Sequence, residues 1–342
     1  MLGEIIFFYR NKHGITQEEL ASGICSISYL SKLENGKIHP NKDIIRDLFN
    51  KLGLSLEDIV EEEKQLISLL EELKELILSR RADLATQKKK EIEMLIANKM
   101  VNPTVLRSNF ILEIGFQLLT KNVQRATEVH STVEVFVKYL TIEQKYLYHK
   151  YTGLLYYESN DMVRCLEELL VGLDIGENNH IIRPDLYYQL ALAYSRLYQV
   201  PICVYYAEKA LTLFDQASDY IRSTECKILL GINHNRLSNF QKAESYLRSA
   251  LKFANSYGTP HLSCIVLHNL GFLYSARGDR KIAINYYLES LKIRNESDVN
   301  RYLNTLYYLA KEYYSSNQQS TAIEWILRVW SLPQVGMLNF TR

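Results

Sequence analysis

The chain has 342 residues, of which 47% are hydrophobic and 23% charged, a balance that is typical of a globular protein and excludes a disordered chain. Its 14 glycines and 6 prolines are too few to favour a turn-rich β architecture. The formal net charge of +1 gives no overall sign of nucleic-acid binding, so any such function must rest on a local surface.

Targeting and redox features of the sequence indicate a cytoplasmic protein. The sequence contains no run of about 18 apolar residues, so it predicts no transmembrane helix. Residues 1–14 lack the basic leader and the small-residue cleavage site of a signal peptide. The five cysteines form no C-x-x-C pair, and an odd number fits free thiols in a reducing compartment. We therefore expect a cytoplasmic location and no disulfide.

Residues 1–60 carry the start and stop signals of five short helices. Apolar residues at helical spacing predict the first helix over residues 2–12. Thr16 and Glu19 form the T-x-x-E pattern of a capping box, which starts the second helix. The remaining helices are expected to begin at Ser26, Asn41 and Ser55. The segment has seven Lys and Arg against eight Asp and Glu, which counts against strong phosphate binding.

Three patterns in this segment resemble the Xre/Cro-type helix-turn-helix family. They are G-x-T-Q-E-E-L-A at residues 14–21, Y-L-S-K-L-E-N-G-K at residues 29–37 and L-G-L-S-L-E-D at residues 52–58. The run from Cys25 to Leu33 is one residue shorter than in most of that family, and this shortened form is similar to peptide-pheromone regulators of the PlcR type.

The resemblance implies that the third helix enters the major groove of DNA with its N-terminal side chains at the base edges. The residues of this chain that match the base-contacting positions are Ser26, Ile27, Ser28, Tyr29 and Lys32. Backbone phosphates would be contacted by Gln17, Asn35 and Lys37. Two alternatives remain open at this point: Ile27 can belong to the core, and Ser26 can act only as a helix cap.

Residues 61–104 are expected to form connector helices. Leucine and isoleucine recur at helical spacing from Leu66 to Ile77, which makes a wide apolar stripe that must pack on something. The stripe could form a coiled dimer seam or dock on the first repeat that follows. Lys88, Lys89 and Lys90 lie among acidic neighbours, which predicts a solvent-exposed helix face rather than a nucleic-acid patch.

From about residue 105 a small residue recurs every 38 to 40 residues, within the pattern L-G/A-x-x-Y or a close variant. These positions are Gly153, Ala191, Gly231, Gly271 and Ala310. Twelve residues after each comes a second small residue: Cys165, Cys203, Ala243, Ala283 and Ala322. The pattern resembles the tetratricopeptide repeat, in which small residues let two antiparallel helices pack closely, although each unit here is about 39 residues instead of 34. Gly115 suggests one further degenerate unit, and residues 64–100 another.

Arrays of this kind curve, and the first helix of each pair lines the concave face. Polar and aromatic residues at inward-facing positions are suited to an extended peptide, because amide groups can pair with its backbone and basic groups with a carboxylate. The candidates are Tyr188, Arg196, Glu225, Asn235, Arg236, His268, Asn304, Tyr307 and Lys311. The alternative for each is ordinary exposed helix surface.

No motif of an enzyme is found. The sequence has no G-x-x-x-x-G-K-[ST] or G-x-G-x-x-G loop, no H-E-x-x-H and no Cys/His cluster at metal-ligand spacing. His234 replaces a repeat tyrosine and is expected to be a packed or surface residue rather than a ligand or a base. We therefore expect no catalytic residue, no metal and no cofactor.

These features together predict an all-α protein. A five-helix Xre/Cro-type domain (residues 1–60) would be followed by connector helices (61–104) that could form a degenerate first repeat, and then by a right-handed superhelical tetratricopeptide-like array (105–342) for sensing and dimerisation. The resemblance implies a quorum-sensing transcription regulator, a homodimer on an operator in double-stranded DNA, whose array binds a short signalling peptide and no membrane. One alternative is a repeat-domain adaptor that sequesters a protein such as a response regulator. Another is an enzyme-modulating repeat protein with a vestigial head.

Overall fold

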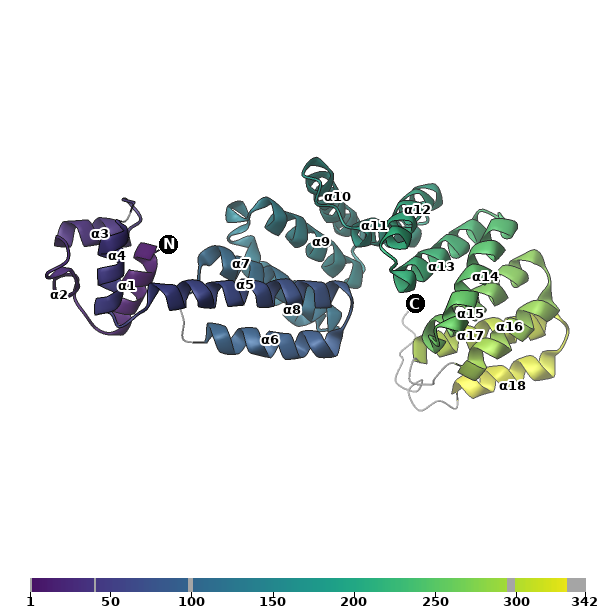
Figure 1. Ribbon diagram of the computed structural model, residues 1–342. Coiled ribbons are helices and arrows are strands. Elements are labelled where there is room, and N and C mark those ends of the chain that lie inside the picture. The colour runs from purple at the N-terminus through teal and green to yellow at the C-terminus, as the bar shows by residue number, and fades with distance from the viewer. Residues whose placement is uncertain (1, 40, 98–100, 294–298, 331–342) are drawn as a thin grey trace. The chain divides into compact units, whose positions relative to one another are not determined.

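The computed structural model describes residues 2–39, 41–97, 101–293 and 299–330, and every regular element within these ranges is a helix (Figure 1). The chain divides into two compact units, residues 1–161 and 162–342. The all-α class and the order of head and repeats that the sequence predicts are therefore confirmed. Within the described ranges, no helix combines the length and apolar character that crossing a membrane requires.

Unit 1 holds the head, the connector and the first repeat helices. Its elements are α1 (Leu2–Lys12), α2 (Gln17–Ala21), α3 (Ile27–Glu34), α4 (Lys42–Lys51), α5 (Leu56–Leu78), α6 (Ala82–Ile96), α7 (Pro103–Leu119), α8 (Val123–Glu134), the 3₁₀ turn η1 (Val137–Tyr139) and α9 (Ile142–Glu158).

Unit 2 is a succession of helical hairpins. Its helices are α10 (Met162–Asn178), α11 (Pro184–Arg196), α12 (Val200–Gln216), α13 (Tyr220–Arg236), α14 (Phe240–Ser256), α15 (Pro260–Arg277), α16 (Arg280–Ile293), α17 (Val299–Ser315) and α18 (Gln319–Trp330).

Local capping starts the head helices where the sequence predicts. Thr16 and Glu19 form the complete capping box at α2, with each side chain accepting from the other residue's backbone N–H. Ser26 accepts a hydrogen bond from the Tyr29 N–H at 3.1 Å, and Asn41 caps α4. These helices enclose a small core of fully buried side chains: Ile6, Leu20, Leu30, Leu48 and Phe49.

The expectation of five short helices is wrong for the fifth. Helix α5 has 23 residues and runs without a break from Leu56 to Leu78, through the boundary expected after residue 60. The second half of α5 carries an apolar stripe that packs on other helices. This packing stabilises the helix beyond residue 60 and explains its length. The head and the connector thus share one helix.

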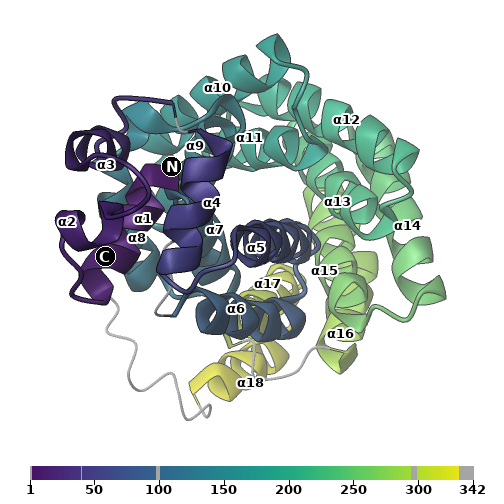
Figure 2. The same ribbon diagram turned by 60° about the vertical axis from the view of Figure 1, so that its left-hand side comes forward.

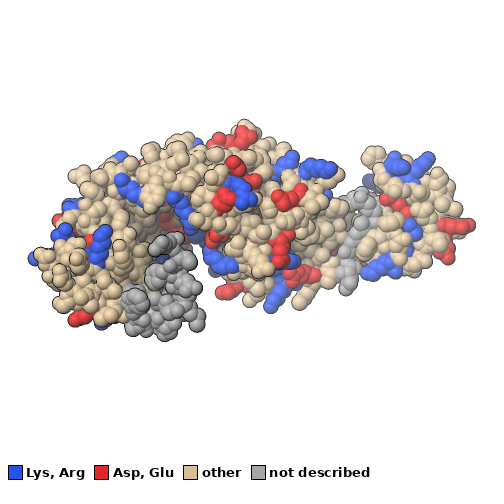
Figure 3. Space-filling model, turned by 180° about the vertical axis from the view of Figure 1, so that it is seen from behind, with Lys and Arg blue, Asp and Glu red and all other residues tan. Residues whose placement is uncertain are grey.

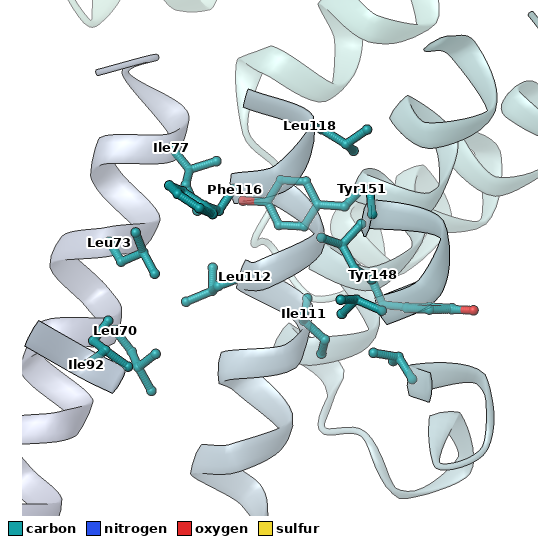
Figure 4. Packing of buried hydrophobic residues seen from close by; sticks show 14 of the residues in the cluster. Leu70, Leu73, Ile77, Ile92, Ile111, Leu112, Phe116, Leu118, Tyr148 and Tyr151 are labelled. Atoms are coloured by element: carbon teal, nitrogen blue, oxygen red, sulfur yellow. The ribbon is translucent and has the colours of Figure 1, made fainter. Parts of the chain in front are cut away.

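The apolar stripe of α5 docks on the first repeat helices, which was one of the two alternatives. Leu70, Leu73 and Ile77 are buried in a cluster with residues of α7 and α9. Figure 4 shows Leu73 and Ile77 of α5 on the side of the helix that faces Leu112 and Phe116 of α7. Helix α6 returns alongside α5 and contributes Ile92 to the same cluster. The hairpin of α5 and α6 therefore packs on the first repeat helices.

The lysine run of α6 is not the solvent-exposed face that the sequence predicts. Lys89 is buried, and its Nζ lies 2.6 Å from Oε2 of Glu113 on α7. Lys88 forms ion pairs with Glu72 and Glu91, both at 2.8 Å. Only Lys90 of the three is exposed. Glu72 on α5 and Glu113 on α7 are therefore partners of these lysines across the helix packing, which sequence spacing alone does not reveal.

The repeat register is confirmed by how closely the small residues let the helices approach. A Cβ atom at Gly231 would lie 2.6 Å from Cγ of Leu247, and one at Gly271 would lie 2.6 Å from Cε1 of Tyr287. No side chain larger than hydrogen fits there without moving its neighbour. The second register of small residues is likewise buried: Cys165, Cys203, Ala243, Ala283 and Ala322. Within unit 2, α11, α13, α15 and α17 form the inner layer and α12, α14, α16 and α18 the outer layer (Figures 1 and 2).

Candidate functional sites: the third head helix and a groove in unit 2

Helix α3 presents an exposed edge at its N-terminal end. Ile27 is 48% exposed, so the alternative that places it in the core is wrong. Ser28 and Lys32 are also exposed. Ser26 is exposed as well, but its hydroxyl is occupied as the cap of α3. Ile27, Ser28 and Lys32 therefore form the accessible part of the predicted reading surface.

Two of the other predicted DNA contacts are tied into the head. Tyr29 is half-buried, and its hydroxyl accepts the backbone N–H of Asn41 at 3.2 Å. The side-chain amide of Gln17 donates to Oε2 of Glu34 at 2.6 Å. Glu34 in turn forms a buried ion pair with Arg10, with Arg10 Nε donating to Glu34 Oε1 at 2.7 Å. This network fixes α1, α2 and α3 to one another beneath the exposed edge.

The region after α3 is accessible. Asn35 and Lys37 are both exposed, although the Asn35 amide also donates to the Ser31 carbonyl at 2.7 Å. On the face of the molecule seen in Figure 3, Lys and Arg side chains alternate with Asp and Glu and form no continuous basic surface. This face agrees with the balanced charge of the head sequence.

Unit 2 contains a groove of about 300 Å³ that crosses four successive inner helices. Its apolar floor consists of Leu192, Ile228, Leu229, Ile232 and Ile265. Its polar lining consists of Tyr188 on α11, Glu225 on α13, His268 on α15, and Arg301 and Asn304 on α17. A mostly apolar cavity with a few convergent polar groups is the usual form of a ligand site.

Hydrogen bonds fix one wall of this groove. Thr305 is fully buried, and its single hydroxyl proton is donated to the Arg301 carbonyl at 3.0 Å. The same hydroxyl lies within hydrogen-bond distance, 3.0 Å, of Nδ1 of His268. Arg301 also donates from its guanidinium to Nε2 of His261 at 3.3 Å. The positions of His268 and Arg301 are thus coupled through Thr305.

The groove brings together four of the nine predicted peptide contacts: Tyr188, Glu225, His268 and Asn304. Tyr307 is 62% exposed and Lys311 is exposed, and both lie on α17 outside the groove lining. Arg196, at the end of α11, is likewise exposed and outside it.

Two further predicted contacts lie outside the groove lining, and Arg236 is exposed but tied to the neighbouring repeat. Asn235 is buried. Arg236 donates to the carbonyl and hydroxyl oxygens of Ser195 at 2.7 and 2.9 Å, and its guanidinium lies 4.6 Å from the ring centre of Tyr198. These contacts join α11 to α13, so Arg236 is placed as a structural link between neighbouring repeats.

Sequence reasoning missed Arg301 and the apolar floor. Arg301 lies one turn before Asn304 on the same face of α17, so the helical period that found Asn304 could also have found it. The floor residues occupy positions that also suit ordinary core packing, so their sequence pattern does not mark them as lining a groove.

His234 behaves as a packed residue. Its ring stacks on Tyr246 with 5.6 Å between centres, and burial lowers its pKa. Neither ring nitrogen has a hydrogen-bond partner among the described residues. Within the ranges that the structure describes, no cluster of three or more His, Cys, Asp or Glu could hold a metal ion. All five cysteines are free thiols.

Comparison with known proteins agrees with this architecture. A helix-turn-helix family matches residues 6–59, and a tetratricopeptide repeat family matches residues 265–297. The transcriptional activator NprA of Geobacillus stearothermophilus is 31% identical over 314 residues, which cover 89% of this chain and 75% of NprA. The chain belongs to the RRNPP family of regulators. The likeness to NprA, a transcriptional activator and no enzyme, identifies the chain as a transcription regulator.

Two further relatives of this RRNPP protein are informative. The crystal structure of NprR in complex with its cognate peptide NprX has a TM-score of 0.69 at 21% identity, covering 78% of this chain and 77% of NprR. Response regulator aspartate phosphatase H of Bacillus subtilis (strain 168) is 23% identical over 174 residues, half of this chain and 46% of the phosphatase. The NprR likeness shows the fold alone.

Proposed function

We propose that this RRNPP regulator binds an operator through α3 and a short signalling peptide through the groove of unit 2, and that the peptide alters operator binding. We further propose that it acts in the cytoplasm as a homodimer, because two heads are needed to read two half-sites about one helical turn, roughly 34 Å, apart.

Three exposed residues of α3 support a base-reading role for this helix. Lys32 can donate to the O6 and N7 atoms of guanine, and the Ser28 hydroxyl can pair with several bases. The aliphatic side chain of Ile27 is suited to the methyl group of thymine. Tyr29 and Gln17 are assigned instead to holding the head together, because their polar ends are already occupied within it.

The groove across α11, α13, α15 and α17 is the observation that supports peptide binding by unit 2. Its apolar floor can take a side chain, while Tyr188, Glu225, His268, Arg301 and Asn304 offer the donors and acceptors that a peptide backbone requires. A structurally similar protein, NprR, has been crystallised with a peptide, which favours a peptide over other ligands of this size.

The mechanism would be a shift between two arrangements of the protein. A peptide can change operator binding only by the difference between its affinities for the two arrangements. A difference of about 1.4 kcal/mol gives a tenfold change in that equilibrium. The regulator therefore needs only one or two good polar contacts that form in one arrangement and not in the other.

Fluorescence anisotropy with labelled genomic fragments tests the proposal, with and without a random hexapeptide pool. We expect specific binding to a two-fold symmetric site and a change in affinity when peptide is added. Lys32→Ala should weaken specific binding, while Lys252→Ala, which removes an exposed charge from outer helix α14, should leave it unchanged. The absence of any specific fragment with or without peptide would refute the DNA-binding part.

A second candidate is an adaptor that sequesters a response regulator. It is favoured by the likeness to a response regulator aspartate phosphatase over half of this chain. A pull-down with the full chain separates the two candidates. A stoichiometric response regulator, recovered equally with and without the peptide pool, would support the adaptor.

A further inference from the structure

We propose that Tyr29 is a positioning residue for sequence reading. Its hydroxyl fixes the exposed edge of α3 relative to the start of α4, and it acts without touching DNA. This inference rests on the proposed operator-binding function and names the residue that sets how selectively α3 reads a site. The sequence resemblance alone places Tyr29 at the base edges, and the two roles predict different binding behaviour.

Tyr29 joins the starts of two helices. Its backbone N–H donates to Oγ of Ser26, the cap of α3, at 3.1 Å. Its hydroxyl accepts the backbone N–H of Asn41, the cap of α4, at 3.2 Å. The Asn41 side chain in turn accepts the N–H of Asp43 at 2.9 Å. One chain of hydrogen bonds therefore runs from the cap of the reading helix into the first turn of α4.

The ring of Tyr29 holds this link in one place. Tyr29 is half-buried and packs against the head core, which includes the fully buried Leu30. A tyrosine side chain has only two rotatable bonds, so packing of the ring also fixes the hydroxyl. The neighbouring residues Ile27, Ser28 and Lys32 are exposed. The packed ring and the exposed reading edge therefore belong to the same two turns of α3.

The same hydrogen bond closes the connection between α3 and α4. This connection leaves the end of α3 at Asn35 and is tied back to the first turn of α3 where Asn41 meets Tyr29. It carries Lys37, which is exposed and, like Asn35, is a predicted phosphate contact. Phosphate contacts set the register of a protein on the duplex, and base contacts read the sequence. Tyr29 therefore keeps the two kinds of contact in a fixed spatial relation.

The link between Tyr29 and Asn41 contributes modestly to folding. Asn41 is exposed, so its N–H can donate to water when the tyrosine hydroxyl is absent. Reading is more demanding, because side chains at a binding site must be held within about 0.5 Å of their productive positions. A head without the link stays folded but also populates arrangements that do not fit the operator. Its apparent affinity falls with the fraction of molecules that fit.

Fluorescence anisotropy of the full chain tests this inference. The probes are a duplex that the wild type selects from a random-sequence pool and a non-specific duplex of equal length, each titrated at several salt concentrations. Tyr29→Phe removes the hydroxyl alone. The matched control Tyr9→Phe removes the hydroxyl of another half-buried tyrosine, which packs against the same core and has no hydrogen bond from its hydroxyl within the described part of the chain.

Tyr29→Phe should lower the ratio of specific to non-specific affinity about 3- to 10-fold, the effect of one net hydrogen bond. Non-specific affinity and its dependence on salt should stay at the wild-type values, because the hydroxyl pairs with no phosphate. The melting temperature of residues 1–161 should fall by no more than about 4 °C. Tyr9→Phe should leave all of these quantities unchanged.

A second background isolates the hydrogen bond itself. Asn41→Pro removes the N–H that Tyr29 accepts, and the φ of Asn41, −73°, is one that proline adopts. This variant also loses the side-chain cap of α4, so only the additional effect of Tyr29→Phe within it is read. That effect should be absent, because the two residues act through one hydrogen bond. A direct contact of the hydroxyl with DNA would persist in this background.

The other outcomes separate the inference from the proposed function. A fall in both specific and non-specific affinity, with a salt slope lower by about one, would make Tyr29 a phosphate contact and overturn the inference. An unchanged affinity ratio in Tyr29→Phe, or the same loss in Tyr9→Phe, would also overturn it while operator binding stands. If the wild type selects no duplex from the pool, the proposed operator binding itself is refuted.

Discussion

Replacing Lys89 by methionine is expected to destabilise unit 1 by about 3 kcal/mol, because it breaks a buried ion pair and leaves the other charge behind. The side chains of Lys89 and Glu113 are 9% and 13% exposed, and their charged atoms lie 2.6 Å apart. The usual cost of removing one partner of such a pair is about 3–5 kcal/mol, and the residual exposure of Glu113 places the value at the lower end.

The loss should be visible as a lower melting temperature of residues 1–161. For a unit of this size each kcal/mol shifts the midpoint by about 2–4 °C, so Lys89→Met should lower it by about 6–12 °C. Because the chain has two units that can unfold separately, thermal unfolding is best followed together with hydrogen exchange of the α6 and α7 amides.

Two matched variants decide whether the buried pair is the cause. Lys90→Met removes the neighbouring exposed lysine and should change stability by less than about 0.5 kcal/mol. The double variant Lys89→Met, Glu113→Leu replaces both charges by apolar groups and should recover most of the loss. Equal, small effects of Lys89→Met and Lys90→Met, or no recovery in the double variant, would refute the reasoning.

Three further predictions follow from exposure, packing and burial. Lys32→Ala should lower operator affinity about 5- to 150-fold and relax the preference at one base pair, as measured by anisotropy on base-substituted sites. Gly271→Ala should lower the melting temperature of unit 2, because the new Cβ lies 2.6 Å from Tyr287 and overpacking of about 1–3 kcal/mol outweighs a helix-propensity gain of about 1. Burial raises the pKa of Cys203 to about 11, so a thiol reagent at pH 8 should modify half-buried Cys25 first. Since the folded pKa of Cys203 exceeds the unfolded value of 9.0, its contribution to stability should be present below pH 9 and be lost as pH rises towards 11.

For each of these three predictions, one experimental outcome would contradict the reasoning. Lys37→Ala is the control for Lys32→Ala, and a uniform loss on every sequence from both variants would place Lys32 on phosphate rather than on a base. A higher melting temperature for Gly271→Ala would mean that the Tyr287 ring moves aside. Equal labelling rates of Cys25 and Cys203 in the folded protein would show that the packing of α12 on α11 opens readily.

The sequence predicted the elements whose signals are local. The caps at Thr16, Ser26 and Asn41 act within three residues, so their chemistry is complete in the sequence. The repeats were predictable for a related reason. Each helix crossing admits only Gly, Ala or Cys, so a small residue recurs at the same position in every repeat. The caps and the repeats can therefore be recognised from residue types at given sequence positions, without knowing which helix surfaces pack together.

Features that depend on tertiary packing were predicted less well. The burial of Lys89 depends on Glu113, which is 24 residues away on another helix. Arg236 is of a residue type that often contacts ligands, but here it joins two repeats through its hydrogen bond to Ser195. The four predicted peptide contacts that line the groove lie three or six residues before the small residue of their repeat, but Tyr307, three residues before Ala310, lies outside it.

The unbroken helix α5 fixes the orientation of its two ends about the helix axis as well as the distance between them. At 1.5 Å and 100° per residue, its 23 residues make a rod about 34 Å long whose two ends have a fixed angular phase. Adding one residue near Val60 would turn the head by about 100° relative to the docked stripe, whereas adding seven would nearly restore its phase. A change in the length of α5 therefore alters which side of the head faces which way, unless the added residues make nearly whole turns.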